Sequence, residues 1–170
     1  MENGLGEFFQ TLQKLVGQHR QLLEIVRAER ENLVQADHQA IQAIIQRKQD
    51  SIELIGKTES LRIKQIAALA SEWGKPTVDL SLSNLILHVQ AFDPKMAEAL
   101  RSSFHALTIL IQRISEQNKD NQKLLQRSLE NIYEMKKNIL GVASGKAGTY
   151  SQSGQRVAGS KGRHLISREA

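Results

Sequence analysis

The feature that most constrains this chain is a regular spacing of apolar residues, alternately three and four apart, along three long stretches. That spacing places side chains on one side of an α-helix, whereas a strand would alternate by two. The first stretch predicts a helix over about residues 3–34. Its stripe comprises Leu5, Phe8, Leu12, Leu15, His19, Leu22, Val26, Glu29 and Leu33.

The second stretch predicts a helix over about residues 37–73, and charged residues interrupt its stripe. The members are Ile41, Ile45, Lys48, Ile52, Ile55, Glu59, Arg62, Ile66, Leu69 and Trp73. A charged side chain buried alone would cost several kcal/mol, so Lys48, Glu59 and Arg62 must pair or reach water. Glu59 and Arg62 are three residues apart, so they can pair on one face of the helix.

The predicted helix ends carry recognisable signals. Asp37 is suited to cap the second helix, which Gly74 and Pro76 then terminate. Asp93 and Pro94 are suited to begin the last helix, since proline needs no N–H partner at the first helical position. Between them, residues 77–89 are ambiguous, and we expect a crossover with a short helix over 83–90 capped by Ser83.

The third stretch predicts a helix over about residues 94–140, ending at Gly141. Its alternation of four and three over about five heptads is typical of a coiled coil. The polar residues Asn118 and Asn121 depart from it, and such residues on a seam can specify register or partner. The seam comprises Leu107, Ile111, Ile114, Asn118, Asn121, Leu125, Ser128, Ile132, Met135 and Ile139.

Residues 141–170 differ from the rest of the chain. They hold five of the 23 Lys and Arg residues but one of the 18 acidic residues, so they carry most of the net charge of +5. Rich in Gly and Ser, they cannot bury enough surface to offset their ordering entropy, and we expect a flexible basic tail. The alternative of nucleic-acid binding through this tail predicts steeply salt-dependent binding. We expect no nucleic-acid partner, because residues 1–140 are nearly neutral.

The sequence shows no catalytic or metal-binding motif. Cys is absent, and none of the five His has a Glu three residues before it, so thiolate sites and the Glu-x-x-His motif of di-iron bundles are excluded. There is no P-loop, G-x-S-x-G or H-E-x-x-H. We therefore expect a protein that is not an enzyme and holds no metal or cofactor. The absence of a secretory signal and of a long uncharged apolar run predicts a cytoplasmic protein without membrane insertion.

Three groups of residues resemble the FlgN family of flagellar export chaperones. The first runs from Leu33-Val34 through Asp37 and Ile41 to Arg47-Lys48, Glu59 and Arg62. The second is Asn118-x-x-Asn121-x-x-Leu124-Leu125 on the last predicted helix. The third is Thr149-Tyr150-Ser151-x-x-Gly154-Gln155 in the tail. The stretch after Gln155 lies outside the recognised pattern.

The resemblance implies an all-α, antiparallel bundle of long, coiled-coil-like helices in residues 1–140, followed by the disordered tail. It also implies a cytoplasmic type III export chaperone. Such a protein binds hook-associated (hook–filament junction) proteins, prevents their premature assembly or degradation, and delivers them to the export gate. The implied partners are these junction proteins and the cytoplasmic domain of the export gate, with the export ATPase as a further candidate.

These expectations assign roles to residues. Five apolar residues that continue the last seam are expected to bind the client: Ile132, Met135, Ile139, Leu140 and Val142. The resemblance assigns Tyr150, Gly154 and Gln155 to docking on the export gate. Lys48, Glu59, Arg62, Asn118 and Asn121 form the expected polar seam. The alternative is a structural coiled-coil protein, a scaffold or tether, that self-assembles.

Overall fold

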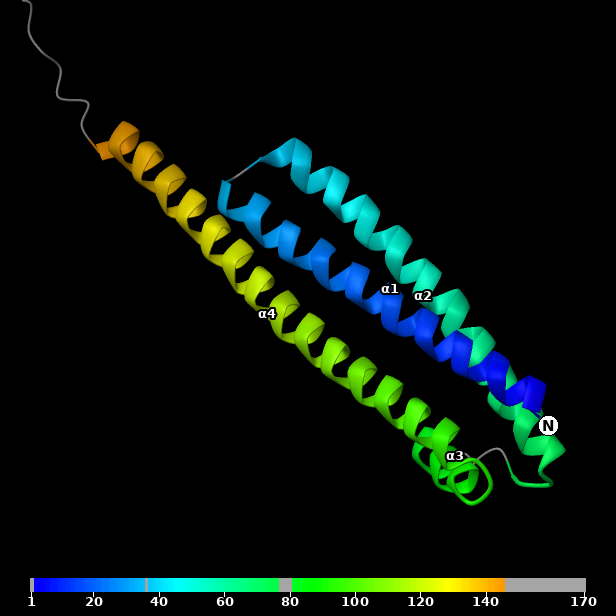
Figure 1. Ribbon diagram of the computed structural model, residues 1–170. Helices are drawn as coiled ribbons and strands as arrows, with labels where there is room; N and C mark the ends of the chain where they lie inside the picture. The colour runs from blue at the N-terminus through cyan, green and yellow to red at the C-terminus, as the bar shows by residue number, and fades with distance from the viewer. Residues whose placement is uncertain (1, 36, 77–80, 146–170) are drawn as a thin grey trace, which may run out of the picture. The chain divides into compact units, whose positions relative to one another are not determined.

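The computed structural model describes residues 2–35, 37–76 and 81–145, and in these ranges it contains four helices and no strand (Figure 1). They are α1 (Glu2–Gln35), α2 (His38–Glu72), α3 (Leu82–Gln90) and α4 (Pro94–Gly145). The predicted all-α fold of long helices is therefore confirmed. The expected tail lies outside the described residues, apart from the first five positions.

The chain divides into two compact units, and the first ends at Arg127. In this unit α1 and α4 run in the same direction, and α2 runs in the opposite direction (Figure 1). The backbones of α1 and α2 approach each other most closely. In its described part the second unit consists of the remainder of α4, from Ser128 onward.

The two ends of α2 have the caps that the sequence predicts. The side chain of Asp37 accepts hydrogen bonds from the backbone N–H groups of Gln39 and Ala40 at 3.1 and 3.0 Å. At the other end Gly74 has a φ of 62°, which a residue with a Cβ adopts only with strain. The N–H of Lys75 then donates to the carbonyl of Ala70 at 2.9 Å, completing a Schellman motif.

The crossover contains the expected short helix, but the predicted cap at Ser83 is wrong. Ser81 is the N-cap, because its hydroxyl accepts from the N–H of Asn84 at 3.2 Å. That N–H lies in the first turn and has no helical partner, whereas Ser83 is already inside the helix. The start of α4 is as predicted, with Asp93 accepting from the N–H of Met96 at 2.9 Å.

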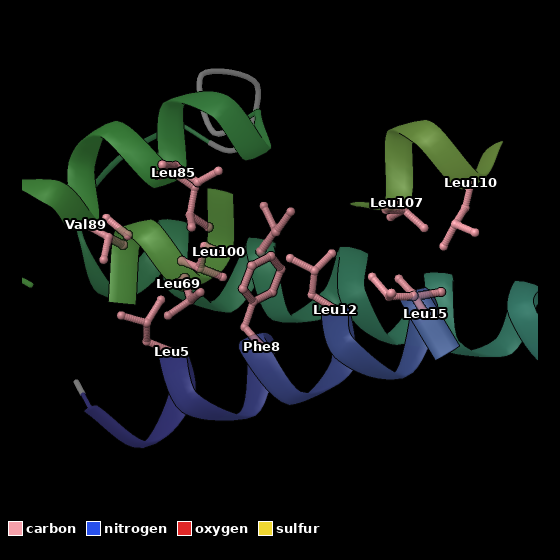
Figure 2. Close-up of a cluster of buried hydrophobic side chains, with 14 of the residues drawn as sticks. Leu5, Phe8, Leu12, Leu15, Leu69, Leu85, Val89, Leu100, Leu107 and Leu110 are labelled. Carbon is pink, nitrogen blue, oxygen red and sulfur yellow. The ribbon is translucent and has the colours of Figure 1, made fainter. Parts of the chain in front are cut away.

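One hydrophobic core joins all four helices in the first unit (Figure 2). The predicted stripe of α1 lies in this core along most of its length, from Leu5 to Val26. On α4 the buried apolar residues begin at Ala97 and end at Ile114. The most completely buried large side chains are Phe8, Leu12, Leu15, Val26, Leu85, Val89 and Leu100.

The stripe predicted for α2 needs correction near its N-terminus. Ile45 and Ile52 are 54% and 47% exposed, whereas Ile44 is buried. A strict alternation of three and four has a period of 3.5 residues, while a straight helix has 3.6, so the two drift apart by about 20° per heptad. The predicted stripe therefore faces the core near Leu69. Toward the N-terminus of α2 it turns progressively away, and at Ile45 it faces solvent.

The predicted end of the last helix at Gly141 also needs correction, because α4 continues to Gly145. Glycine lowers helix propensity by about 1 kcal/mol, but it ends a helix only where the chain also turns. No proline follows Gly141 within the helix, and Val142-Ala143-Ser144 continues it.

Candidate functional site

The exposed part of α4 is the first candidate site. Every side chain from Ser128 to Leu140 is exposed. Six of them are large and apolar, with exposed fractions between 58% and 73%. We call these six the distal patch: Leu129, Ile132, Tyr133, Met135, Ile139 and Leu140.

Helical geometry gathers the distal patch on one broad face. Ile132, Met135 and Ile139 follow the spacing of three and four, so they form one row along the helix. Leu129 and Tyr133 are four residues apart and lie on the flank of this row. The arrangement has the apolar anchors of a helix that packs against another helix.

The structure leaves four of the five expected client residues uncovered: Ile132, Met135, Ile139 and Leu140. Val142 lies in α4, but its side chain is outside those described. Leu129 and Tyr133 were not predicted as members of this surface. The spacing of Leu129, four after Leu125 and three before Ile132, was the available signal. The expected gate-docking residues Tyr150, Gly154 and Gln155 lie outside the described residues.

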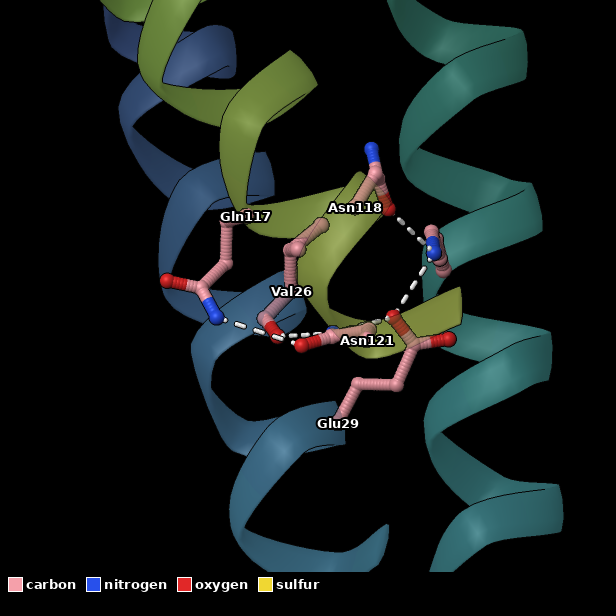
Figure 3. A network of polar contacts seen from close by, with 6 residues as sticks. Val26, Glu29, Gln117, Asn118 and Asn121 are labelled. Atoms are coloured by element: carbon pink, nitrogen blue, oxygen red, sulfur yellow. Dashed lines mark hydrogen bonds and ion pairs between the residues drawn. The ribbon is translucent and has the colours of Figure 1, made fainter. Parts of the chain in front are cut away.

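A polar layer joins α1, α2 and α4 in the first unit, formed by Glu29, Lys48, Asn118 and Asn121 (Figure 3). The Lys48 Nζ donates to Glu29 Oε2 and to Asn118 Oδ1, both at 2.8 Å. The Asn121 Nδ2 donates to the same carboxylate oxygen and to the carbonyl of Val26, both at 2.9 Å. The charged side chains of the layer are therefore hydrogen-bonded to one another and to asparagines, and these bonds link three helices.

This polar layer brings together three of the expected polar seam residues, namely Lys48, Asn118 and Asn121. Asn121 is only 4% exposed, and its carbonyl oxygen accepts from Gln117 Nε2 at 3.1 Å, so its amide is satisfied on both sides. The pairing of Lys48 with Glu29 was not predicted from the sequence. Opposite charges on the seams of two consecutive helices were the available signal.

The other two polar seam residues pair with each other beside a groove of about 550 Å³ in the first unit. The Arg62 Nε donates to Glu59 Oε2 at 2.8 Å, and a second bond joins Arg62 Nη2 to Glu59 Oε1. These hydrogen bonds lower the pKa of Glu59, against the opposing effect of burial, and raise the pKa of Arg62. His19 lines the same groove, with its Nδ1 2.8 Å from the carbonyl oxygen of Leu15.

Glu59 is poorly suited to act as a general base in this groove. A general base works best with a pKa near the working pH, whereas the pKa of Glu59 lies below the usual carboxylate value. Among the described residues no group of three or more potential metal ligands comes together. Within the same ranges, no helix has the length and apolarity required to cross a bilayer.

The fold and the distal patch define a class: a protein of long helices with an uncovered apolar face on one of them. The chain belongs to the FlgN family, since the family model described as FlgN protein matches residues 1–158. This is a family of flagellar export chaperones that act in flagellum biogenesis, and it is not known for enzymes. Comparison with curated proteins and with solved structures gave no match.

Proposed function

We propose that this chain is a cytoplasmic, non-enzymatic export chaperone that binds hook-associated junction proteins. It prevents their premature assembly or degradation and delivers them to the export gate. The observation that carries the proposal is the distal patch, six large apolar side chains exposed on a single helix.

The distal patch is an uncovered apolar surface that a partner can bury. Burying one large apolar side chain contributes about 1.5–3 kcal/mol, and the patch offers six. Monomeric proteins rarely leave a contiguous apolar surface of this kind without a partner. A client with an amphipathic helix would cover the row formed by Ile132, Met135 and Ile139, because such helices present apolar anchors at matching intervals.

Client binding would also protect the client. Subunits that assemble through apolar helices would associate early if those helices stayed exposed. A chaperone that occupies the same face replaces that contact, so the client stays unassembled until release. Within this proposal Leu140 and Val142 extend the client surface toward the C-terminus of α4.

Delivery to the export gate is assigned in this proposal to Tyr150, Gly154 and Gln155, which lie within the range that the family model matches. The gate's cytoplasmic domain is the proposed second partner, with the export ATPase as a further candidate. The separation of the two roles predicts that Tyr150→Ala weakens gate docking while client binding survives. Equal loss of both in pull-downs would contradict it.

The decisive experiment is co-purification of junction proteins with the full chain and with the triple variant Ile132→Ser, Met135→Ser, Ile139→Ser. We expect the variant to lose the client while its helical circular dichroism stays unchanged. The control is Leu54→Ser with Leu61→Ser, which removes two apolar residues of α2 that are about half exposed. A triple variant that still retains the client would overturn the proposal.

Deletion of residues 136–170 provides a second test. We expect client binding to disappear and the helicity of the remaining chain to persist. A self-assembling scaffold, the alternative function, predicts instead that the chain alone forms oligomers that grow with concentration. A mass measurement with and without client separates the two, because the chaperone gives a complex of defined mass.

A further inference from the structure

One charged side chain, that of Lys136, lies inside the distal patch. At about 100° per residue, the members of the patch span an arc of roughly 160° around α4, and Lys136 falls within this arc. Residues three and four positions apart are neighbours on the surface of a helix. The neighbours of Lys136 at these spacings, in both directions, are all exposed members of the patch: Ile132, Tyr133, Ile139 and Leu140.

The other charged residues between Ser128 and Leu140 lie on the opposite side of α4. Glu130 and Glu134 are four residues apart, and Lys137 follows Glu134 by three, so these side chains share one polar face. No carboxylate occurs three or four residues from Lys136 in the sequence. The helix therefore offers the Lys136 ammonium no carboxylate at the spacing that allows pairing, whereas it offers one to Lys137.

The first unit shows how this chain accommodates a lysine that other helices cover. The side chain of Lys48 on α2 is only 22% exposed. Its Nζ donates to Glu29 Oε2 of α1 and to Asn118 Oδ1 of α4, each at 2.8 Å. A neighbouring helix thus supplies the carboxylate. Without such a partner, a covered ammonium would lose its hydration with no compensating bond.

A client helix that covers the distal patch would cover Lys136 as well. Ile132 and Ile139 lie on one side of the lysine, and Tyr133 and Leu140 lie on the other. A lysine stem can carry its ammonium toward the edge of a contact, but here both edges are apolar. The client must then place an acceptor within reach. A carboxylate is the strongest acceptor, because the resulting hydrogen bond is assisted by charge.

We infer that Lys136 determines client specificity, and that the client helix carries an aspartate or glutamate within its apolar stripe that pairs with Lys136. The inference rests on the proposed function, because it concerns the client that the distal patch binds. Apolar contact discriminates little among amphipathic helices. A charge pair inside the contact favours a helix with a carboxylate at one position and disfavours helices that lack it.

The variant Lys136→Met tests the inference by the direction of its effect on the affinity of the full chain for a purified junction protein. It removes the charge and keeps an unbranched apolar stem. The client carboxylate then stays covered and unpaired, so the dissociation constant should rise at least about tenfold. A client without that carboxylate would bind the variant more tightly, because no ammonium would lose its hydration. Unchanged or tighter binding would therefore overturn the inference.

The matched control is Lys137→Met, which removes the same charge from the adjacent residue on the polar face. Its dissociation constant should stay within about twofold of the wild-type value, because exposed charges at the rim of a contact contribute little to affinity. A rise equal to that of Lys136→Met would show a general attraction between the two proteins and would contradict a specific pair. Both lysines are exposed in the free chain, so the helical circular dichroism of both variants should be unchanged.

Charge reversal identifies the partner residue. Lys136→Glu should raise the dissociation constant at least about 100-fold, because two carboxylates then meet inside the contact. Each aspartate and glutamate in the helical segments of the client is changed to lysine in turn. One of these clients should bind the Lys136→Glu chain at least about tenfold more tightly than the unaltered client does. If no altered client recovers binding, the proposed pair does not exist.

These measurements also separate the inference from the proposed function. A wild-type chain that binds no junction protein overturns both. A chain that loses its client in the triple variant of the distal patch, yet binds it equally well with Lys136→Glu, overturns the inference alone.

Discussion

Helix α4 contains two segments with the same apolar pattern and different environments. Between Pro94 and Arg127 Leu100, Leu107 and Ile114 are buried in the core, whereas Ile111 and Leu125 of the predicted seam are 49% and 46% exposed. From Ser128 onward Ile132, Met135 and Ile139 continue the spacing and are exposed. The comparison shows that an apolar stripe identifies the side of a helix that is suited to apolar contact. It does not show whether another part of the same chain makes that contact.

The length of α1 explains where the first unit ends. The polar layer sets Asn121 of α4 beside Glu29 of α1, and α1 ends six residues later at Gln35. Those residues extend about 9 Å, which reaches to about the level of Arg127. The first unit ends at that residue.

The largest expected difference between the two segments is in stability. Phe8→Ala empties a fully buried position in the core that contains the first segment of α4, and should lower the free energy of unfolding by about 3–5 kcal/mol. Ile132→Ala in the second segment should change it by less than about 0.5 kcal/mol. Urea denaturation of both variants measures the two changes in unfolding free energy. Comparable decreases would show that the distal patch is covered.

The polar layer lies at the end of the buried segment of α4. Loss of its charges should have the next largest effect on the free energy of unfolding. Lys48→Met leaves Glu29, whose side chain is only 14% exposed, without its cation, and should cost about 1–3 kcal/mol. The double variant Lys48→Met, Glu29→Gln should recover part of that loss, because no unpaired charge remains. If the double variant is less stable than the single one, the layer does not act through this charge pair.

The smallest effect is expected at the pair of Glu59 and Arg62. Arg62→Ala should lower the free energy of unfolding by less than about 1 kcal/mol, because the pair is partly solvated. The melting temperature should therefore fall slightly. An unchanged melting temperature would indicate that solvent screens the pair completely.

The same pair predicts a pH dependence with a definite sign. Because folding lowers the pKa of Glu59 from 4.5, its contribution to stability is present above that pH and disappears as the pH falls through the folded value. The difference in unfolding free energy between the wild type and Glu59→Gln should therefore shrink below about pH 4.5. A difference that grows on acidification would show that folding does not lower the pKa of Glu59.

Much of the architecture could be predicted from local signals. The helix ends depend on contacts within a few residues. Asp37 and Asp93 accept hydrogen bonds from nearby backbone N–H groups, and Gly74 lets the backbone turn, so their effects do not depend on distant parts of the chain. The stripe of α1 was predictable for the same reason, since its period lies in the sequence. Ser83 and Gly141 were misassigned where neighbouring residues offered nearly equal alternatives.

The identity of the covered residues depends on distant parts of the chain. Nothing near Ile45 in the sequence reveals that the straight axis of α2 turns it out of the core, and nothing near Ile139 reveals that its side chain is exposed. Local hydrogen bonds and caps determined which residues form helices. Burial depends on which helix lies alongside and how far it extends, and that follows from the packing of segments up to about a hundred residues apart, as between Val26 and Asn121.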